Sequence, residues 1–386
     1  MRKYFEFYSG IKIKCGEEAL STLGEELRYW GCERPLLISS PNATHLGATE
    51  KVLGSVDKKI KKGTIVFDAI PKKFDLGVVR ELKKQYLEKK CDGIVAVGGD
   101  CAMDTAKALR LFLSQECDDL IPIGFAVTQK LREVPLFAIP TENGSGKEST
   151  GTLECDDSFT VSQALIPNVV IIDDAVAMTA PTRTDAACGM TALANAIEAY
   201  VGTEDENPSD IYAQKAIRLL NKNLEKAVKD GENEESCRAV ALAGTLAGVA
   251  YGNNPFGGAH ALAEALAEIA GEPVEEMYGI TLAPSLAFAR KTHETRIKQL
   301  LLDLTDETTF AETPESERAQ RAVDAVGAFA EKLRTLSGIP TKISQTKITR
   351  ESFGDIAEAA AGKRAAITAY KPLSKEDFLT ILNDAY

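Results

Sequence analysis

The chain has 386 residues, a length at which two domains are expected because single hydrophobic cores stop growing beyond about 250–300 residues. Its formal net charge of −12 disfavours nucleic acid and anionic membranes as partners, since both bind basic surfaces. No apolar run of about 18 residues and no signal-peptide pattern is found, so we expect a cytoplasmic protein.

The first half of the chain alternates short β-rich runs with amphipathic stretches. The predicted strands cover residues 36–39, 64–67, 93–97 and 136–139, and the predicted helices include residues 76–87 and 103–113. Such alternation is typical of βαβ units, in which helices join parallel strands. We therefore expect a parallel α/β domain over residues 1–178.

The second half has almost no strand signal. From residue 179 onward the chain consists of long Ala- and Leu-rich helical patterns, interrupted at Gly189, at residues 251–258 and at Pro273. Residues 305–316 are acidic and polar, which predicts a loop. We expect a helical domain over residues 179–386, with the catalytic cleft between the two domains.

A glycine pair follows the predicted strand at residues 93–97. Gly98 and Gly99 come directly after the apolar run, and a helical pattern begins shortly afterwards. Glycines let backbone N–H groups approach a phosphate closely, and the N-terminal end of a helix favours an anion. The pattern predicts a phosphate-binding turn, with an ordinary strand-to-helix connection as the alternative.

Two glycine-rich segments of the first half resemble signatures of the iron-containing alcohol dehydrogenases. Residues 98–107 (GGDCAMDTAK) resemble the signature GGGSxxDxAK, with Asp100 and Cys101 in place of the usual Gly and Ser. Residues 139–150 (IPTENGSGKEST) resemble the second glycine loop, commonly IPTTxGTGSEVT. Residues 167–174 (PNVVIIDD) are similar to the strand that closes the nucleotide domain.

The resemblance continues through the second half. Residues 189–200 (GMTALANAIEAY) resemble GMDALTHAIEAY, and residues 259–264 (AHALAE) are similar to AHALAH. The likeness therefore covers nearly the whole chain. It implies an α/β N-terminal Rossmann-like dinucleotide-binding domain followed by an all-α C-terminal helical domain.

The resemblance implies NAD or NADP as the cofactor. The expected cofactor-binding residues are Ser40, Gly98, Gly99, Asp100, Asp104, Thr141, Gly144 and Ser145. Ser40 follows the first strand where an acidic residue would normally bind the ribose hydroxyls, so there is room for the 2′-phosphate of NADP. Alternatively, Ser40 caps a helix that begins near Ala43. Asp100 should weaken diphosphate binding by charge repulsion unless its side chain turns away.

The family's metal site is not preserved. Its members bind one divalent metal, typically iron or zinc, through one Asp and three His of the helical domain, and the metal polarises the substrate oxygen. These positions fall on Thr191, Asn195, His260 and, depending on the register, Val274 or Tyr278. The two remaining histidines of the chain lie outside the matching motifs. Because Val is no ligand and a neutral Tyr is a poor one, we expect no metal.

Four polar residues are the candidate catalytic group. Glu264 replaces a further family His that lies near the nicotinamide, one helical turn after His260. With Thr191 and Asn195, these side chains are expected to face the same cleft, because positions i and i+4 share a helix face. His260, assisted by the Glu264 carboxylate, would then donate a hydrogen bond and a proton to a substrate oxygen.

Three interpretations remain open. In the first, the chain is an NAD(P)H-dependent oxidoreductase that interconverts an alcohol and an aldehyde or ketone without a metal. In the second, it is a catalytically silent dinucleotide-binding paralogue. In the third, a metal is held by a new set of ligands, such as His260 and Glu264 with Asp185 or Glu268. The expected partners are a small alcohol or carbonyl substrate and, from base rates, a second copy in a homodimer.

Overall fold

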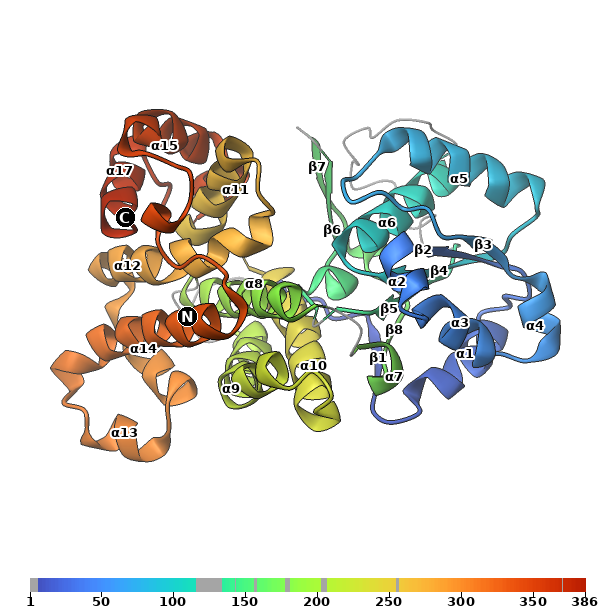
Figure 1. Cartoon of the computed structure of the whole chain (residues 1–386), viewed down its shortest axis with the longest axis horizontal. Helices are drawn as coiled ribbons and strands as arrows, with labels where there is room; N and C mark the ends of the chain where they lie inside the picture. The colour runs from blue at the N-terminus through green and yellow to red at the C-terminus, as the bar shows by residue number, and fades with distance from the viewer. Residues whose placement is uncertain are drawn as a thin grey trace. The chain divides into compact units, whose positions relative to one another are not determined.

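The structure is a computed structural model that describes residues 6–115, 134–142, 144–155, 158–177, 181–202, 207–254, 257–369 and 371–386. The chain divides into two compact units (Figure 1). The N-terminal unit is Tyr8–Ala180, and the helical unit comprises Met1–Phe7 and Pro181–Tyr386.

The N-terminal unit is built on a six-stranded sheet with the order β1-β8-β5-β4-β2-β3. Its strands are β1 (Lys12–Cys15), β2 (Pro35–Ser39), β3 (Ile65–Phe67), β4 (Gly93–Gly98), β5 (Leu136–Pro140) and β8 (Val169–Ile172). Every neighbouring pair in this sheet is parallel. A separate antiparallel pair is formed by β6 (Thr152–Cys155) and β7 (Ser158–Val161).

Helices cover both faces of this sheet, because its central strands are apolar on both sides. The helices are α1 (Leu23–Tyr29), α2 (Pro41–His45), α3 (Ala48–Gly54), α4 (Lys58–Gly63), α5 (Leu76–Glu88), α6 (Asp100–Gln115) and α7 (Asp174–Ala177). Val95 and Val97 of β4 share a buried cluster with Leu23 of α1, Val52 of α3 and Ile60 of α4. In Figure 1, α5 and α6 are drawn on the opposite side of the strands.

The strand order reverses between β2 and β4. The chain passes from β2 outward to β3 and then crosses to β4 on the other side of β2. In open parallel sheets, ligands bind beyond the carboxyl ends of the strands at such a point. Ser40 directly follows β2 and Gly99 directly follows β4, so the topology brings both residues to this end of the sheet.

The helical unit consists of α8 (Thr182–Val201), α9 (Pro208–Lys229), α10 (Glu234–Tyr251), α11 (Gly258–Ala270), α12 (Val274–Leu304), α13 (Glu307–Glu312), α14 (Glu315–Ser337), α15 (Phe353–Gly362), α16 (Arg364–Thr368) and α17 (Lys375–Asp384). Every residue of α8 from Asp185 onward is buried. A Cβ atom on Gly189 would overlap the Leu224 side chain of α9, so glycine permits this close packing. None of the described helices is long and apolar enough to cross a membrane.

The fold class predicted from the sequence is confirmed, with one correction in the helical unit. Residues 305–316, predicted as a loop, contain α13 and the beginning of α14. The side chain of Asp306 caps α13 by accepting a hydrogen bond from the backbone N–H of Thr309 at 2.9 Å. The acidic residues of this segment therefore begin helices, because carboxylates are favourable at helix N-termini.

Candidate active site

The turn after β4 has a conformation that favours glycine. Gly98 has φ +147°, which L side chains rarely adopt, and a Cβ atom there would lie 3.0 Å from the Cβ of Ala102. The same position is 3.8 Å from Oγ of Ser40, so the ends of β2 and β4 meet at this turn. The carbonyl of Gly99 accepts from the N–H of Ala102 at 3.0 Å, in the first turn of α6. A glycine turn that leads into the N-terminus of a long helix is suited to phosphate.

Two carboxylates lie at this turn. A Cβ atom on Gly99 would overlap the carboxylate of Glu142, so that side chain packs directly against the glycine. Asp100 accepts a hydrogen bond from the hydroxyl of Ser145. Because a dinucleotide diphosphate is negative, both carboxylates oppose its approach in this conformation. Sequence reasoning missed Glu142, although an acidic residue in place of the second Thr of IPTT was an available signal.

Other predicted cofactor residues gather around the same turn. The backbone N–H of Thr141 donates to the carbonyl of Gly98 at 3.3 Å, and that of Gly144 donates to the carbonyl of Glu142 at 2.7 Å. Oγ of Ser40 accepts from the N–H of Ala43 at 3.2 Å, so Ser40 caps α2 as the alternative interpretation held. Contact of these residues with a cofactor stays a prediction.

A fully buried lysine holds the second glycine loop. Nζ of Lys107 donates to the carbonyl of Lys147 at 2.7 Å, to Oγ1 of Thr150 at 3.1 Å and to the carbonyl of Thr152 at 2.9 Å. Burial lowers the pKa of Lys107 to about 8, against the opposing effect of the Asp104 carboxylate. Asp104, one of the predicted cofactor residues, also pairs with Nζ of Lys147 at 3.0 Å. These contacts fix the loop to α6.

In the helical unit, the imidazole of His260 is bonded at both ring nitrogens. Nδ1 contacts the carboxylate of Glu198, and Nε2 lies 2.8 Å from Oδ1 of Asn195. His260 is only 2% exposed, and Asn195 and Glu198 are 5% and 9% exposed. Both partners are oxygen acceptors, so either ring N–H of His260 has an acceptor within the protein.

Glu198 also organises the N-terminus of α11. Its carboxylate accepts from the backbone N–H of Gly257 at 3.1 Å and of Ala259 at 2.7 Å. A carboxylate at this end of a helix satisfies donors that lack partners within the helix. Sequence reasoning named Glu264 as the carboxylate that assists His260, whereas the carboxylate that contacts Nδ1 belongs to Glu198. Asn195 and Glu198 are three residues apart on α8, which was an available signal for a shared face.

Two tyrosines enclose the imidazole. The ring of Tyr251 is stacked on that of His260 with centroids 4.8 Å apart, and Tyr278 meets it edge-on at 4.9 Å. Of the two alternatives for the family's last ligand position, Tyr278 therefore contacts His260. Val274 is the first residue of α12. An aromatic enclosure excludes water and strengthens the electrostatic interactions of the imidazole.

The remaining predicted catalytic residues lie near this group along the same helices. The hydroxyl of Thr191 donates to the carbonyl of Ala187 at 3.0 Å, one turn back on α8. Glu264 is half-buried, one turn beyond His260 on α11. Glu268, considered as a carboxylate of a new metal site, is exposed and pairs with Lys363. Asp185 is buried at the beginning of α8.

A parallel sheet with a glycine turn at its carboxyl end, followed by an all-α unit, defines a Rossmann-like α/β fold joined to a helical domain. Two family descriptions match the chain: "Iron-containing alcohol dehydrogenase" over residues 11–174, and "Fe-containing alcohol dehydrogenase family, C-terminal" over residues 185–386. The chain therefore belongs to the iron-containing alcohol dehydrogenase family.

Individual relatives agree with this assignment. The chain is 26% identical to long-chain-alcohol dehydrogenase 1 of Geobacillus thermodenitrificans, over 96% of this chain and 94% of that protein. It is 30% identical to the NAD-dependent methanol dehydrogenase of Bacillus methanolicus, over 64% of this chain and 66% of that protein. The solved alcohol dehydrogenase of Oenococcus oeni superposes with a TM-score of 0.85 at 25% identity, covering 99% of this chain and 100% of that one.

His260 and the side chains that contact it, which are Asn195, Glu198, Tyr251 and Tyr278, are called the His260 group here. These residues do not fit the divalent metal that the family name implies. Of the expected ligands, only His260 is a histidine, and both of its nitrogens are bonded to side chains of α8. Across the described parts of the chain, no group of three or more His, Cys, Asp or Glu side chains is placed to hold a metal ion. Neutral oxygens of Thr191 and Asn195 are weak substitutes for imidazole and carboxylate ligands.

Proposed function

We propose that this chain is an NAD(P)H-dependent oxidoreductase that interconverts a small alcohol and its aldehyde or ketone without a divalent metal. Membership of a family of alcohol dehydrogenases supports the reaction class. The proposal that the reaction needs no metal rests on one observation: the imidazole of His260 is buried, and both of its nitrogens contact oxygen acceptors of side chains.

The glycine turn would hold the nucleotide. Backbone N–H groups near Gly98 and Gly99, together with the N-terminus of α6, are donors suited to the diphosphate. The name of the NAD-dependent methanol dehydrogenase among its relatives supports NAD, whereas the neutral Ser40 accommodates NADP equally well. When bound, the reduced cofactor supplies the hydride. For the diphosphate to enter, the carboxylate of Glu142 turns away from Gly99.

His260 would stabilise the reacting oxygen in place of the metal. A carbonyl that accepts hydride develops negative charge on its oxygen, and a positioned N–H donor stabilises that charge. The substrate oxygen replaces Oδ1 of Asn195 as the partner of Nε2, and the Nε2 proton then passes to the oxygen. Glu198 retains the proton on Nδ1, which keeps the ring oriented throughout.

A catalytically silent paralogue is the second candidate. The observation that favours it is the same bonding of His260, because Nε2 is engaged by Oδ1 of Asn195 in this conformation. A new metal site has less support. Glu268, one of its possible carboxylates, is engaged by Lys363 at the surface.

The test combines nucleotide binding with turnover. Titration calorimetry with NADH and NADPH should give saturable binding, and aldehydes or ketones should be reduced slowly by the purified protein. His260→Ala should lower kcat about 100-fold, the usual scale for losing a general acid, whereas Glu268→Gln should leave kcat unchanged. Nucleotide binding with no turnover across a broad carbonyl panel establishes the silent paralogue. Loss of turnover in Glu268→Gln favours the metal site.

A further inference from the structure

The helical unit contains a cavity that is lined in part by Glu198. Its volume is about 120 Å³, and it lies between α8, the N-terminus of α11, α12 and the segment that leads into α17. Most of its wall is apolar, with Ile197, Val201, Leu282, Leu286, Leu373 and Ile381 among the lining residues. An apolar cavity of about 150 Å³ is large enough to bind benzene, so this one has room for four or five carbon atoms.

The cavity is separate from the face of Glu198 that holds His260. Glu198 lines it, but His260, Asn195 and Tyr278 are not among the described residues of its wall. A molecule in the cavity would therefore contact the carboxylate and not the imidazole. This distinguishes the cavity from the position proposed above for the reacting oxygen.

The inner end of the cavity presents an unpaired hydroxyl. Ser285 of α12 is 6% exposed, and its Oγ has no hydrogen-bond partner within the described part of the chain. A buried hydroxyl without a partner is unfavourable, and a bound polar group that pairs with it would remove that cost. Cβ atoms placed on Gly258 and Gly257 would lie 3.6 Å from Oγ of Ser285 and 2.5 Å from Oε1 of Glu198, so both oxygens flank this glycine pair.

A donor and an acceptor thus meet at one end of an apolar space. The Ser285 hydroxyl can donate, and the Glu198 carboxylate can accept. A carboxylate ligand is disfavoured here because it would face Glu198. A neutral hydroxyl satisfies both groups, since it accepts from Ser285 and donates to Glu198.

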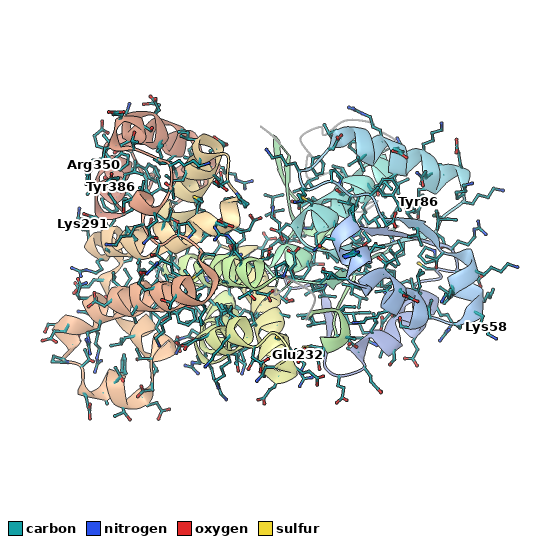
Figure 2. The ribbon with its side chains drawn as sticks, viewed as in Figure 1. Lys58, Tyr86, Glu232, Lys291, Arg350 and Tyr386 are labelled. Carbon is teal, nitrogen blue, oxygen red and sulfur yellow. The ribbon has the colours of Figure 1, made fainter. Side chains whose placement is uncertain are left out.

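The opposite end of the cavity is exposed and basic. Lys291 and Lys371 line it and are both exposed. Nζ of Lys291 lies 4.4 Å from the ring centroid of Phe288, and Figure 2 labels Lys291 beside α12. Neither lysine forms an ion pair with another described residue. Asp377 also lines the cavity, but its carboxylate accepts from the N–H of Ser374 at 2.9 Å as part of the cap of α17.

The spacing of the two ends sets the length of the ligand. Ser285 and Lys291 are six positions apart on α12, which corresponds to about 9 Å along the helix at 1.5 Å per residue. We propose that this cavity binds an unbranched hydroxy acid of four to six carbons. Its hydroxyl lies between Ser285 and Glu198, its methylene chain fills the apolar space, and its carboxylate lies at Lys291 and Lys371.

The experiment is a calorimetric titration of the full chain with three probes that share a five-carbon chain: 5-hydroxypentanoate, pentanoate and 1,5-pentanediol. The hydroxy acid should bind with a stoichiometry of one and the highest affinity. Ser285→Ala should weaken 5-hydroxypentanoate about tenfold, the scale of one hydrogen bond, and leave pentanoate unchanged. The double variant Lys291→Gln/Lys371→Gln should weaken both acids and leave the diol unchanged.

Ser285→Ala is expected to fold at least as stably as the wild type, because it removes a buried hydroxyl without a partner. Ala289→Phe, which fills the cavity, should abolish binding of all three probes. The proposal is overturned if none of the probes binds saturably, or if 5-hydroxypentanoate binds Ser285→Ala as tightly as the wild type. Undiminished binding to a folded Ala289→Phe protein overturns it as well. None of these outcomes depends on nucleotide binding or turnover, so the oxidoreductase proposal is tested separately.

Discussion

Replacing Glu198 by Ala tests how the His260 group is held together. The substitution leaves the N–H groups of Gly257 and Ala259 and the imidazole of His260 without their acceptor, at a site where Glu198 is 9% exposed. Each unsatisfied buried donor costs about 1–3 kcal/mol, and three donors lose their acceptor. At the lower end of that range we expect a loss of about 3–5 kcal/mol in the free energy of unfolding.

The assay is thermal unfolding followed by circular dichroism. Since 1 kcal/mol shifts the Tm of a unit of this size by about 2–4 °C, Glu198→Ala should lower the Tm by about 10 °C. Glu198→Gln is the matched control: it has the same shape and keeps an oxygen acceptor, so its loss should be about half as large. A Glu198→Ala protein as stable as the wild type to within about 1 kcal/mol would show that these hydrogen bonds do not stabilise the fold.

Three further predictions concern the N-terminal unit. Gly99→Val should weaken NADPH binding more than tenfold in calorimetry, because its side chain would occupy the space at the turn next to Glu142; a wild-type Kd would contradict the assigned turn. Glu142→Thr should strengthen NADPH binding severalfold by removing a negative charge from the turn, and weaker binding would contradict the proposed repulsion. The third concerns Lys107, whose folded-state pKa of about 8 lies below its ordinary value of 10.5. The unfolded chain therefore binds more protons between these pH values, and the stability contributed by Lys107 should rise as the pH increases from about 8 to 10. Urea unfolding of the wild type and Lys107→Met across this range should reveal that rise only in the wild type, and parallel profiles would contradict it.

The sheet was largely predictable because its central strands are continuous apolar runs. β2, β3, β4 and β5 correspond to the predicted strands at residues 36–39, 64–67, 93–97 and 136–139. β1 was missed because its sequence KIKC is short and carries two lysines, and it pairs only with β8 at the sheet edge. A strand of this kind is defined by its partner and not by its own hydrophobicity.

The His260 group was predictable only in part. Motif likeness placed Asn195 and His260 together, and the structure joins them through a hydrogen bond. The carboxylate at Nδ1 was missed because Glu198 and His260 lie 62 positions apart in sequence and meet only through the packing of α8 against α11. Helical spacing reports neighbours on one helix and carries no information about contacts between two helices. Glu142 was missed because its contact with Gly99 joins the ends of β5 and β4 and depends on the pairing of these two strands in the sheet.

Metal-independent oxidoreduction supported by His260 can be measured as aldehyde reduction in a single preparation before and after exhaustive chelation with EDTA, with the metal content determined in both samples. We expect far less than one equivalent of iron or zinc per chain, a rate of NAD(P)H oxidation that chelation does not change, and loss of that rate in His260→Ala. A stoichiometric metal whose removal abolishes turnover, and whose return restores it, would show instead that the reaction depends on a metal.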